Sequence, residues 1–221
     1  MNAYNKKTNA DIPVSGDAGR TVLFNMYMPG EARLSLKKFF ENKKIVCDDW
    51  RMRFGYLFGM RRALSRILKT GDTQPAIVVS VSPFIVSQYS DEFDCVIFLK
   101  FPDAFAQRYC LSAGSRLVSS CFYGAPHYPY CTSYTVTADD LPEDIIPGEG
   151  FSGRFCDIAP YIQLFWGKDE EKIREQVECF NEAEWAYVET LTANHIRLYP
   201  ELVRDGFRDA KVRALRWFAI K

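Results

Sequence analysis

The sequence predicts an α+β fold: a single domain with a mixed or mainly antiparallel sheet and a long C-terminal helix packed on it. Short runs rich in β-branched and aromatic residues predict strands, notably at 76–81 and 93–101. Apolar residues repeat with helical spacing at 50–69 and 169–199. The two kinds of segment do not alternate regularly, which favours α+β over α/β. An apolar content of 48% in 221 residues supports a sizeable core.

The first thirty residues divide into a polar part and a strand. Residues 1–20 lack the apolar stretch of a secretory signal, so we expect a flexible leader followed by one domain over 21–221. Residues 21–28 predict a strand that stops at the turn pair Pro29-Gly30. Residues 31–43 then predict a short helix.

Residues 50–69 predict a two-sided helix, because Asp48 or Asp49 can cap its N-terminus and its apolar residues share one side. The apolar side carries Trp50, Phe54, Leu57, Met60, Leu64, Ile67 and Leu68. The other side carries Arg51, Arg62, Arg66 and Lys69.

The middle of the chain predicts the sheet. Runs 76–81 and 93–101 are apolar enough to be buried on both faces and to form its centre. Asp103 can cap a helix that ends at Gly114. Residues 116–123 and 131–137 alternate as strands do.

Residues 138–153 hold five acidic residues, two prolines, three glycines and no basic residue. That composition is typical of a linker or a surface loop. The segment is therefore a possible boundary, although a loop within one domain is the preferred interpretation.

The C-terminal third predicts one strand and the longest helix. Residues 155–166 form a strand that Pro160 would confine to a sheet edge or mark with a bulge. Residues 169–199 form the helix, which has an acidic first turn and stops at Pro200. Residues 211–220 fit either a last strand or a last helix.

The net charge is zero, with 28 basic and 28 acidic residues, so no global field attracts a polyanion and nucleic-acid binding is unlikely. The charges are nevertheless segregated. Residues 33–69 hold eleven basic and three acidic residues, and residues 169–189 hold eight acidic and two basic residues. These segments either face each other or solvent, or form two contact surfaces of opposite sign.

Seven cysteines without a C-x-x-C pair argue against a disulfide framework and for a reducing compartment, so we expect a cytoplasmic protein. No run approaches the roughly 20 apolar residues of a membrane helix, and no membrane association is expected.

Two residues interrupt the apolar stripe of the helix at 169–199. Glu184 lies about one turn from Phe180 and from Val188, and a buried carboxylate there must be paired, hydrogen-bonded or protonated. Either this helix face is partly exposed, or Glu184 is a structural partner of an arginine from residues 51–66; a general acid or base is the third alternative. His195 lies on the same stripe but ~16 Å along the helix, too far to share a proton with Glu184.

The other histidine, His127, lies in a loop rich in tyrosine and proline, where it could bind a ligand or relay a proton. With only two histidines in the chain and no zinc-type spacing, no metal is expected. No cofactor motif occurs, and none is expected.

Two further groups could bind a ligand. Asp91 and Asp94 flank the mouth of the central strand, where ligand-binding carboxylates often gather, and Asp157 could join them if the topology allows. The simpler interpretation is an acidic turn. Arg62 and Arg66 on the basic helix face could contact RNA or phosphate, although docking against the acidic segment explains both faces with one assumption.

No catalytic motif names a reaction, so enzymatic activity is left open. The leading hypothesis is a non-catalytic protein-interaction or regulatory domain, which binds a protein partner or itself through the charged helix faces and the acidic 138–149 loop. The alternative is an enzyme or small-molecule-binding domain. Its pocket would combine the His127 loop, the strand end at Asp91 and Asp94, and Glu184.

Overall fold

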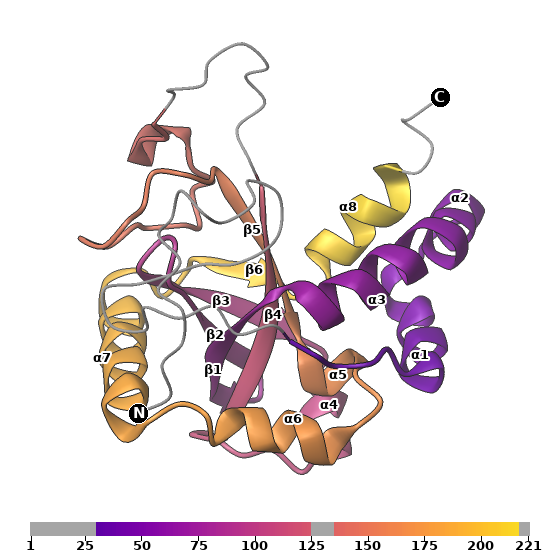
Figure 1. Cartoon of the computed structure of the whole chain (residues 1–221), viewed down its shortest axis with the longest axis horizontal. Helices are drawn as coiled ribbons and strands as arrows, with labels where there is room; N and C mark the ends of the chain where they lie inside the picture. Colours follow the sequence, from indigo (N-terminus) through magenta and orange to yellow (C-terminus); the bar gives the residue numbers. More distant parts are fainter. Residues whose placement is uncertain (1–29, 125–134, 217–221) are drawn as a thin grey trace.

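A six-stranded sheet forms the centre of the protein (Figure 1). The computed structural model describes residues 30–124 and 135–216, so the predicted leader and the strand at 21–28 lie outside the described residues. The strand order is β5-β4-β1-β2-β3-β6. The strands are β1 Asp72–Val81, β2 Phe84–Ser90, β3 Cys95–Phe101, β4 Arg116–Gly124, β5 Asp157–Ile162 and β6 Val203–Asp205.

The sheet is mixed, with one parallel pair. β1, β2 and β3 follow one another as antiparallel neighbours, β4 and β5 extend the sheet beyond β1 in the antiparallel sense, and β6 runs parallel to β3. The α+β prediction with a mixed or mainly antiparallel sheet is confirmed. Pro160 lies in β5 at the edge of the sheet, as its missing N–H requires.

The sheet curls until its two edge strands meet. Arg204 of β6 is buried and donates from Nη1 to the carbonyl oxygen of Ile158 in β5, at 2.7 Å. The same guanidinium pairs with Asp144, through Nη2 to Oδ1 at 2.8 Å. The curl gives the sheet a concave face, which encloses an interior, and a convex face.

The long helix α7 (Glu182–Leu198) packs on the convex face, as predicted for the C-terminal helix. The hydroxyls of Ser87 and Thr192 lie 2.7 Å apart, and the rings of Phe98 and His195 lie 4.3 Å apart. These contacts tie the helix to β2 and β3.

The prediction of one uninterrupted helix over 169–199 is wrong. The chain forms α6 (Glu170–Val177), breaks, and restarts at α7. The break occurs because the Asn181 side chain accepts hydrogen bonds from the backbone N–H groups of Ala183 and Glu184 and so caps a new helix. Phe180 is buried at the break, with its ring 5.8 Å from that of Trp185.

The predicted helix at 50–69 is present, with Asp49 as its N-cap, but it changes pitch on the way. It consists of α2 (Trp50–Gly55), a π-helical turn η2 (Tyr56–Met60) and α3 (Arg61–Thr70). The π turn adds a residue, which rotates the apolar stripe by ~100° between the two ends. Burial of Trp50 and Phe54, which the single-helix pattern implied, is therefore wrong: Met52 and Tyr56 are buried instead.

Four other predicted elements differ from what is observed. The first helix, α1, runs from Leu36 to Val46 and starts after its cap, Ser35. The helix after Asp103 is only α4 (Ala104–Arg108). Residues 135–137 form no strand, and the rest of the predicted strand at 131–137 lies outside the described residues. The predicted strand 155–166 ends at Ile162 and continues as α5 (Gln163–Trp166). Of the two alternatives for residues 211–220, the helix is confirmed over the described part, where α8 (Arg208–Arg216) follows β6.

Aromatic side chains fill one end of the interior. The rings of Phe101 and Phe165 lie 4.9 Å apart, and those of Phe105 and Phe165 lie 5.0 Å apart, all in edge-to-face arrangements. Phe207 packs against Phe101 at 5.4 Å. Each such pair adds about 0.5–1.5 kcal/mol beyond area burial, so this end of the interior is a firmly packed core.

Candidate functional site: a basic and aromatic helical face

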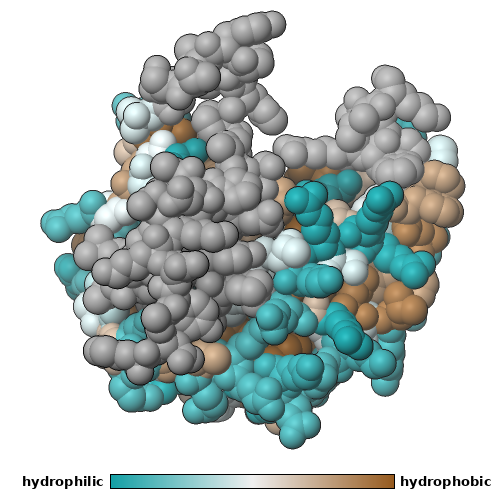
Figure 2. All heavy atoms as spheres, in the orientation of Figure 1, coloured by the Kyte–Doolittle hydropathy of each residue, from teal (hydrophilic) through white to brown (hydrophobic). Residues whose placement is uncertain are grey.

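Three large aromatic residues lie on the outer side of α2 and η2. Trp50, Phe54 and Phe58, each four residues from the next, are 68%, 46% and 57% exposed. The rings of Phe54 and Phe58 lie 4.6 Å apart. Leu36 and Phe40 of α1 are also about half exposed. At the right-hand edge of the molecule, Figure 2 shows hydrophobic side chains (brown) beside hydrophilic ones (teal). Exposed apolar side chains gathered in this way are typical of a contact surface.

A groove of about 860 Å³ runs beside these aromatic residues, between the chain at 32–36 and the helix formed by η2 and α3. Its lining is apolar at Leu34, Leu36 and Leu57. None of the lining residues is acidic. The basic residues that line it are Arg33, Arg61, Arg62, Arg66 and Lys69.

The local sequence explains why this face points outward. α3 buries Leu64, Ile67 and Leu68 against the protein, which leaves its arginines on the solvent side. Tyr56 donates its hydroxyl to the carbonyl oxygen of Phe39 at 2.6 Å and stacks on the Phe39 ring at 4.3 Å. These two contacts fix η2 on α1 and set the shape of the groove.

The acidic segment at 169–189 forms one ion pair with the basic segment at 33–69 and another with β4. Glu170 bonds to Lys38 at 2.7 Å, and Glu182 bonds to Arg116 at 2.6 Å. Within the ranges 30–124 and 135–216, no ion pair joins this segment to Arg61 or Arg62. Arg61 and Arg62 are thus not neutralised by the acidic helices within the described part of the chain.

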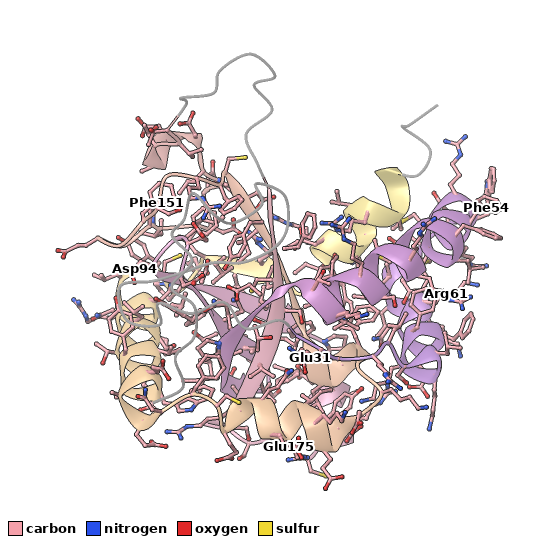
Figure 3. The ribbon with its side chains drawn as sticks, viewed as in Figure 1. Glu31, Phe54, Arg61, Asp94, Phe151 and Glu175 are labelled. Carbon is pink, nitrogen blue, oxygen red and sulfur yellow. The ribbon has the colours of Figure 1, made fainter. Side chains whose placement is uncertain are left out.

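The sequence-predicted residues lie in separate environments. Arg62 and Arg66 line the groove, while His127 lies outside the described residues. Asp94 lies at the β2–β3 turn and accepts hydrogen bonds from the hydroxyl of Tyr187 at 2.8 Å and from the N–H of Gly150 at 2.9 Å (Figure 3). These bonds give Asp94 a role in fastening neighbouring segments.

Asp157 does not join Asp91. Its carboxylate lies 3.1 Å from Arg208 and 3.7 Å from Arg204, at the junction of β5, β6 and α8. Asp91 lies in the interior of the curled sheet, where its carboxylate accepts a hydrogen bond from Tyr123. The expected cluster at the strand end is therefore divided between two places.

Glu184 is a helix cap. Its carboxylate accepts a hydrogen bond from the backbone N–H of Asn181 at 2.7 Å, which completes a reciprocal capping box. Partial burial raises its pKa. His195 is buried, and burial lowers its pKa, while Nε2 lies 3.3 Å from the carbonyl oxygen of Leu202. The contacts of Glu184 and His195 are thus those of residues that stabilise the fold.

Sequence reasoning missed two groups. Trp50 and Phe54 were assigned to the core, and the π turn that exposes them leaves no clear sequence signal. The polar residues of the interior were also missed, although Asp72 and Gln74 precede the apolar run of β1 at alternate positions. That alternation could have indicated one polar strand face.

No family model, curated protein or solved structure matches the chain. Among the described residues, no helix is both long and apolar enough to cross a membrane. The same residues contain no group of three or more His, Cys, Asp or Glu side chains arranged to hold a metal ion.

Proposed function

We propose that this protein is a non-catalytic interaction domain that binds an acidic segment of a partner protein in the groove beside α3. The observation that carries the proposal is the lining of the groove, which combines basic with apolar residues and contains no acidic residue. Arginine and aromatic residues are enriched at the centres of protein interfaces. The segment that fits this lining carries Asp or Glu on one side and large apolar residues on the other.

The shape and charge of the face favour a protein segment over other anions. The groove is open and is lined by leucines as well as by basic residues, which suits an extended or helical peptide. The whole chain is neutral with a pI near 6.7, so it lacks the overall positive charge that favours binding of a nucleic acid.

The exposed charges contribute mainly to encounter and specificity. Basic residues at the rim attract an acidic segment and lose strength as salt rises, with a screening length of about 8 Å at physiological ionic strength. Phe58, at the edge of the groove, is suited to anchor an apolar side chain of the partner.

A binding titration tests the proposal. The probe is a fluorescent peptide of about sixteen residues with alternating acidic and apolar positions, and its anisotropy is followed as protein is added. The Arg61→Glu/Arg62→Glu variant should weaken binding by about tenfold or more, because two attractive charges become repulsive. The matched control is Lys172→Glu/Arg174→Glu, which makes the same charge change on the exposed side of α6 and should leave affinity unchanged.

Three results would overturn the proposal. The peptide fails to bind, both double variants bind equally well, or a vesicle of phosphatidylserine or a single-stranded oligonucleotide binds more tightly than the peptide. Analytical ultracentrifugation of the chain alone then separates two kinds of protein partner. A monomer supports a separate partner, and a dimer lost in Arg61→Glu/Arg62→Glu shows that a second copy occupies the groove.

A further inference from the structure

Carboxyl groups are concentrated inside the curled sheet, at the end opposite the aromatic core. Asp72, Asp91 and Glu92 are fully buried. Asp72 of β1 pairs with Cys121 of β4, which places both side chains on the concave face. The carboxyl groups come from β1 and from the β2–β3 turn, so residues distant in sequence meet here.

Other polar side chains line the same space. They come from β1, β2 and β4, and all are buried. They are Gln74, Gln88, Ser90, Ser119, Cys121 and Tyr123.

Asp91 is a buried carboxylate with one oxygen left without a hydrogen-bond partner in the part of the chain that the structure describes. Its Oδ1 accepts a hydrogen bond from the Tyr123 hydroxyl at 3.0 Å, while Oδ2 has no hydrogen-bond partner among the described residues. The charged groups that act on it are Asp72 and Glu92, both acidic. The cation beside Glu92 is Arg154, at 3.2 Å. An ionised Asp91 would thus be a desolvated charge among like charges.

The polar groups of this interior offer more hydrogen-bond acceptors than donors. Gln74 Oε1 and Gln88 Oε1 are also buried without a hydrogen-bond partner among the described residues. A proton on Asp91 removes the charge and supplies the donor that such a site lacks. Burial, with Asp72 and Glu92 nearby, holds the pKa of Asp91 well above its ordinary value.

A strap formed by residues 148–154 closes this end of the interior. The N–H of Gly148 donates to the carbonyl oxygen of Phe93 at 3.0 Å, and that of Ser152 donates to the carbonyl oxygen of Glu92 at 2.9 Å. The Phe151 ring stacks on Phe93 at 5.6 Å (Figure 3, labelled Phe151). The strap is therefore bound to the turn that carries Asp91.

We propose that Asp91 is a proton-binding site that couples the strap at 148–154 to pH: the strap lies closed while Asp91 is protonated and opens when the proton leaves. Opening admits water to the carboxyl groups and removes the cost of their burial. The proton passes to solvent, and no other reactant is needed.

The raised pKa of Asp91 determines the direction in which strap closure depends on pH. Closure is fully favoured below the ordinary aspartate pKa near 3.8 and weakens as pH rises through the raised value. In that window one proton is released on opening, so the population of the open form increases up to about tenfold per pH unit. Hydrogen bonds from Tyr123 and from the backbone N–H of Glu92 act in the opposite direction, because they favour the ionised carboxylate.

Hydrogen exchange of the strap from pH 5 to pH 8, corrected for the intrinsic pH dependence of exchange, tests the proposal. Protection of residues 148–154 should fall with rising pH, while that of α7 should not. The isosteric Asp91→Asn variant should abolish the dependence, and the exposed-site control Glu143→Gln should retain it. Equal pH dependence in the native chain and in Asp91→Asn would overturn the proposal.

If Asp91→Asn fails to fold, a second variant tests the proposal. Tyr123→Phe removes the hydrogen bond that favours the ionised form, so the pH at which the strap opens should move upward. An unchanged opening pH in Tyr123→Phe would also overturn the proposal. Neither result depends on whether the groove beside α3 binds a peptide.

Discussion

The helical face and the interior of the sheet place the same kinds of residue in opposite surroundings. On the face formed by α1, α2, η2 and α3, aromatic rings such as Phe58 are exposed beside arginines. In the interior, Phe165 and Arg204 are buried, and every charge has to be paired or neutralised. The residue types alone therefore do not separate core from contact surface. The difference lies in what each side chain touches.

The largest contrast is expected between two phenylalanines. Phe165→Ala should lower the free energy of unfolding by about 3–5 kcal/mol, because it empties a site packed by Phe101 and Phe105. Phe58→Ala should change it by less than about 0.5 kcal/mol, since its ring is more than half exposed. Urea denaturation of both variants measures the pair. Similar losses would contradict the assignment of Phe58 to a contact surface.

The next largest difference in stability is expected between variants of two arginines. Arg204→Ala should destabilise the protein by about 3 kcal/mol, because it leaves Asp144 without its main cation and separates β6 from β5. Arg61→Ala should lie within about 0.5 kcal/mol of the native chain, because its side chain is exposed. The midpoint of denaturation measures the stability of both variants. A stable Arg204→Ala variant would mean that the contact between edge strands contributes little.

A smaller effect is expected at the cap of α7. Glu184→Ala removes half of a capping box and should cost about 1 kcal/mol. Glu171→Ala, on the exposed side of α6, is the control and should leave stability within experimental error. A loss of 3 kcal/mol or more at Glu184 would instead indicate a buried ion pair, and no loss would exclude the capping role.

The smallest predicted effect is the change in the stability of the protein as the pH falls below 7. Because burial lowers the pKa of His195, its neutral form is favoured in the folded protein. Its contribution to stability is thus complete above a pH of about 6.5 and declines as the pH falls through the lowered value. His195→Phe should flatten this part of the stability curve, measured by urea denaturation between pH 7 and pH 5. An unchanged slope would show that another group titrates there.

Local signals in the sequence predicted much of the fold. Asp49 caps its helix as expected, β4 matches the predicted bounds of its strand closely, and Pro160 lies in an edge strand. The break before α7 also has a sequence signature, since Asn181 and Glu184 have the spacing of a capping box. The continuous apolar stripe masked that signature.

The candidate sites were harder to predict, because they depend on long-range geometry. Arg62 and Arg66 were identified by their basic stripe, but the groove exists only where residues 32–36 return beside α3. Asp91 was identified at a strand end, yet its burial follows from the curl that brings β1 and β4 over it. No periodicity along one segment encodes either arrangement.

The proposed binding groove is tested most directly by a hydrogen-exchange footprint with and without saturating acidic–apolar peptide. The proposal predicts new protection confined to residues 32–36 and 56–70, and its loss in Arg61→Glu/Arg62→Glu. Protection centred on 138–149 or on the sheet, or no protection at saturation, would contradict it.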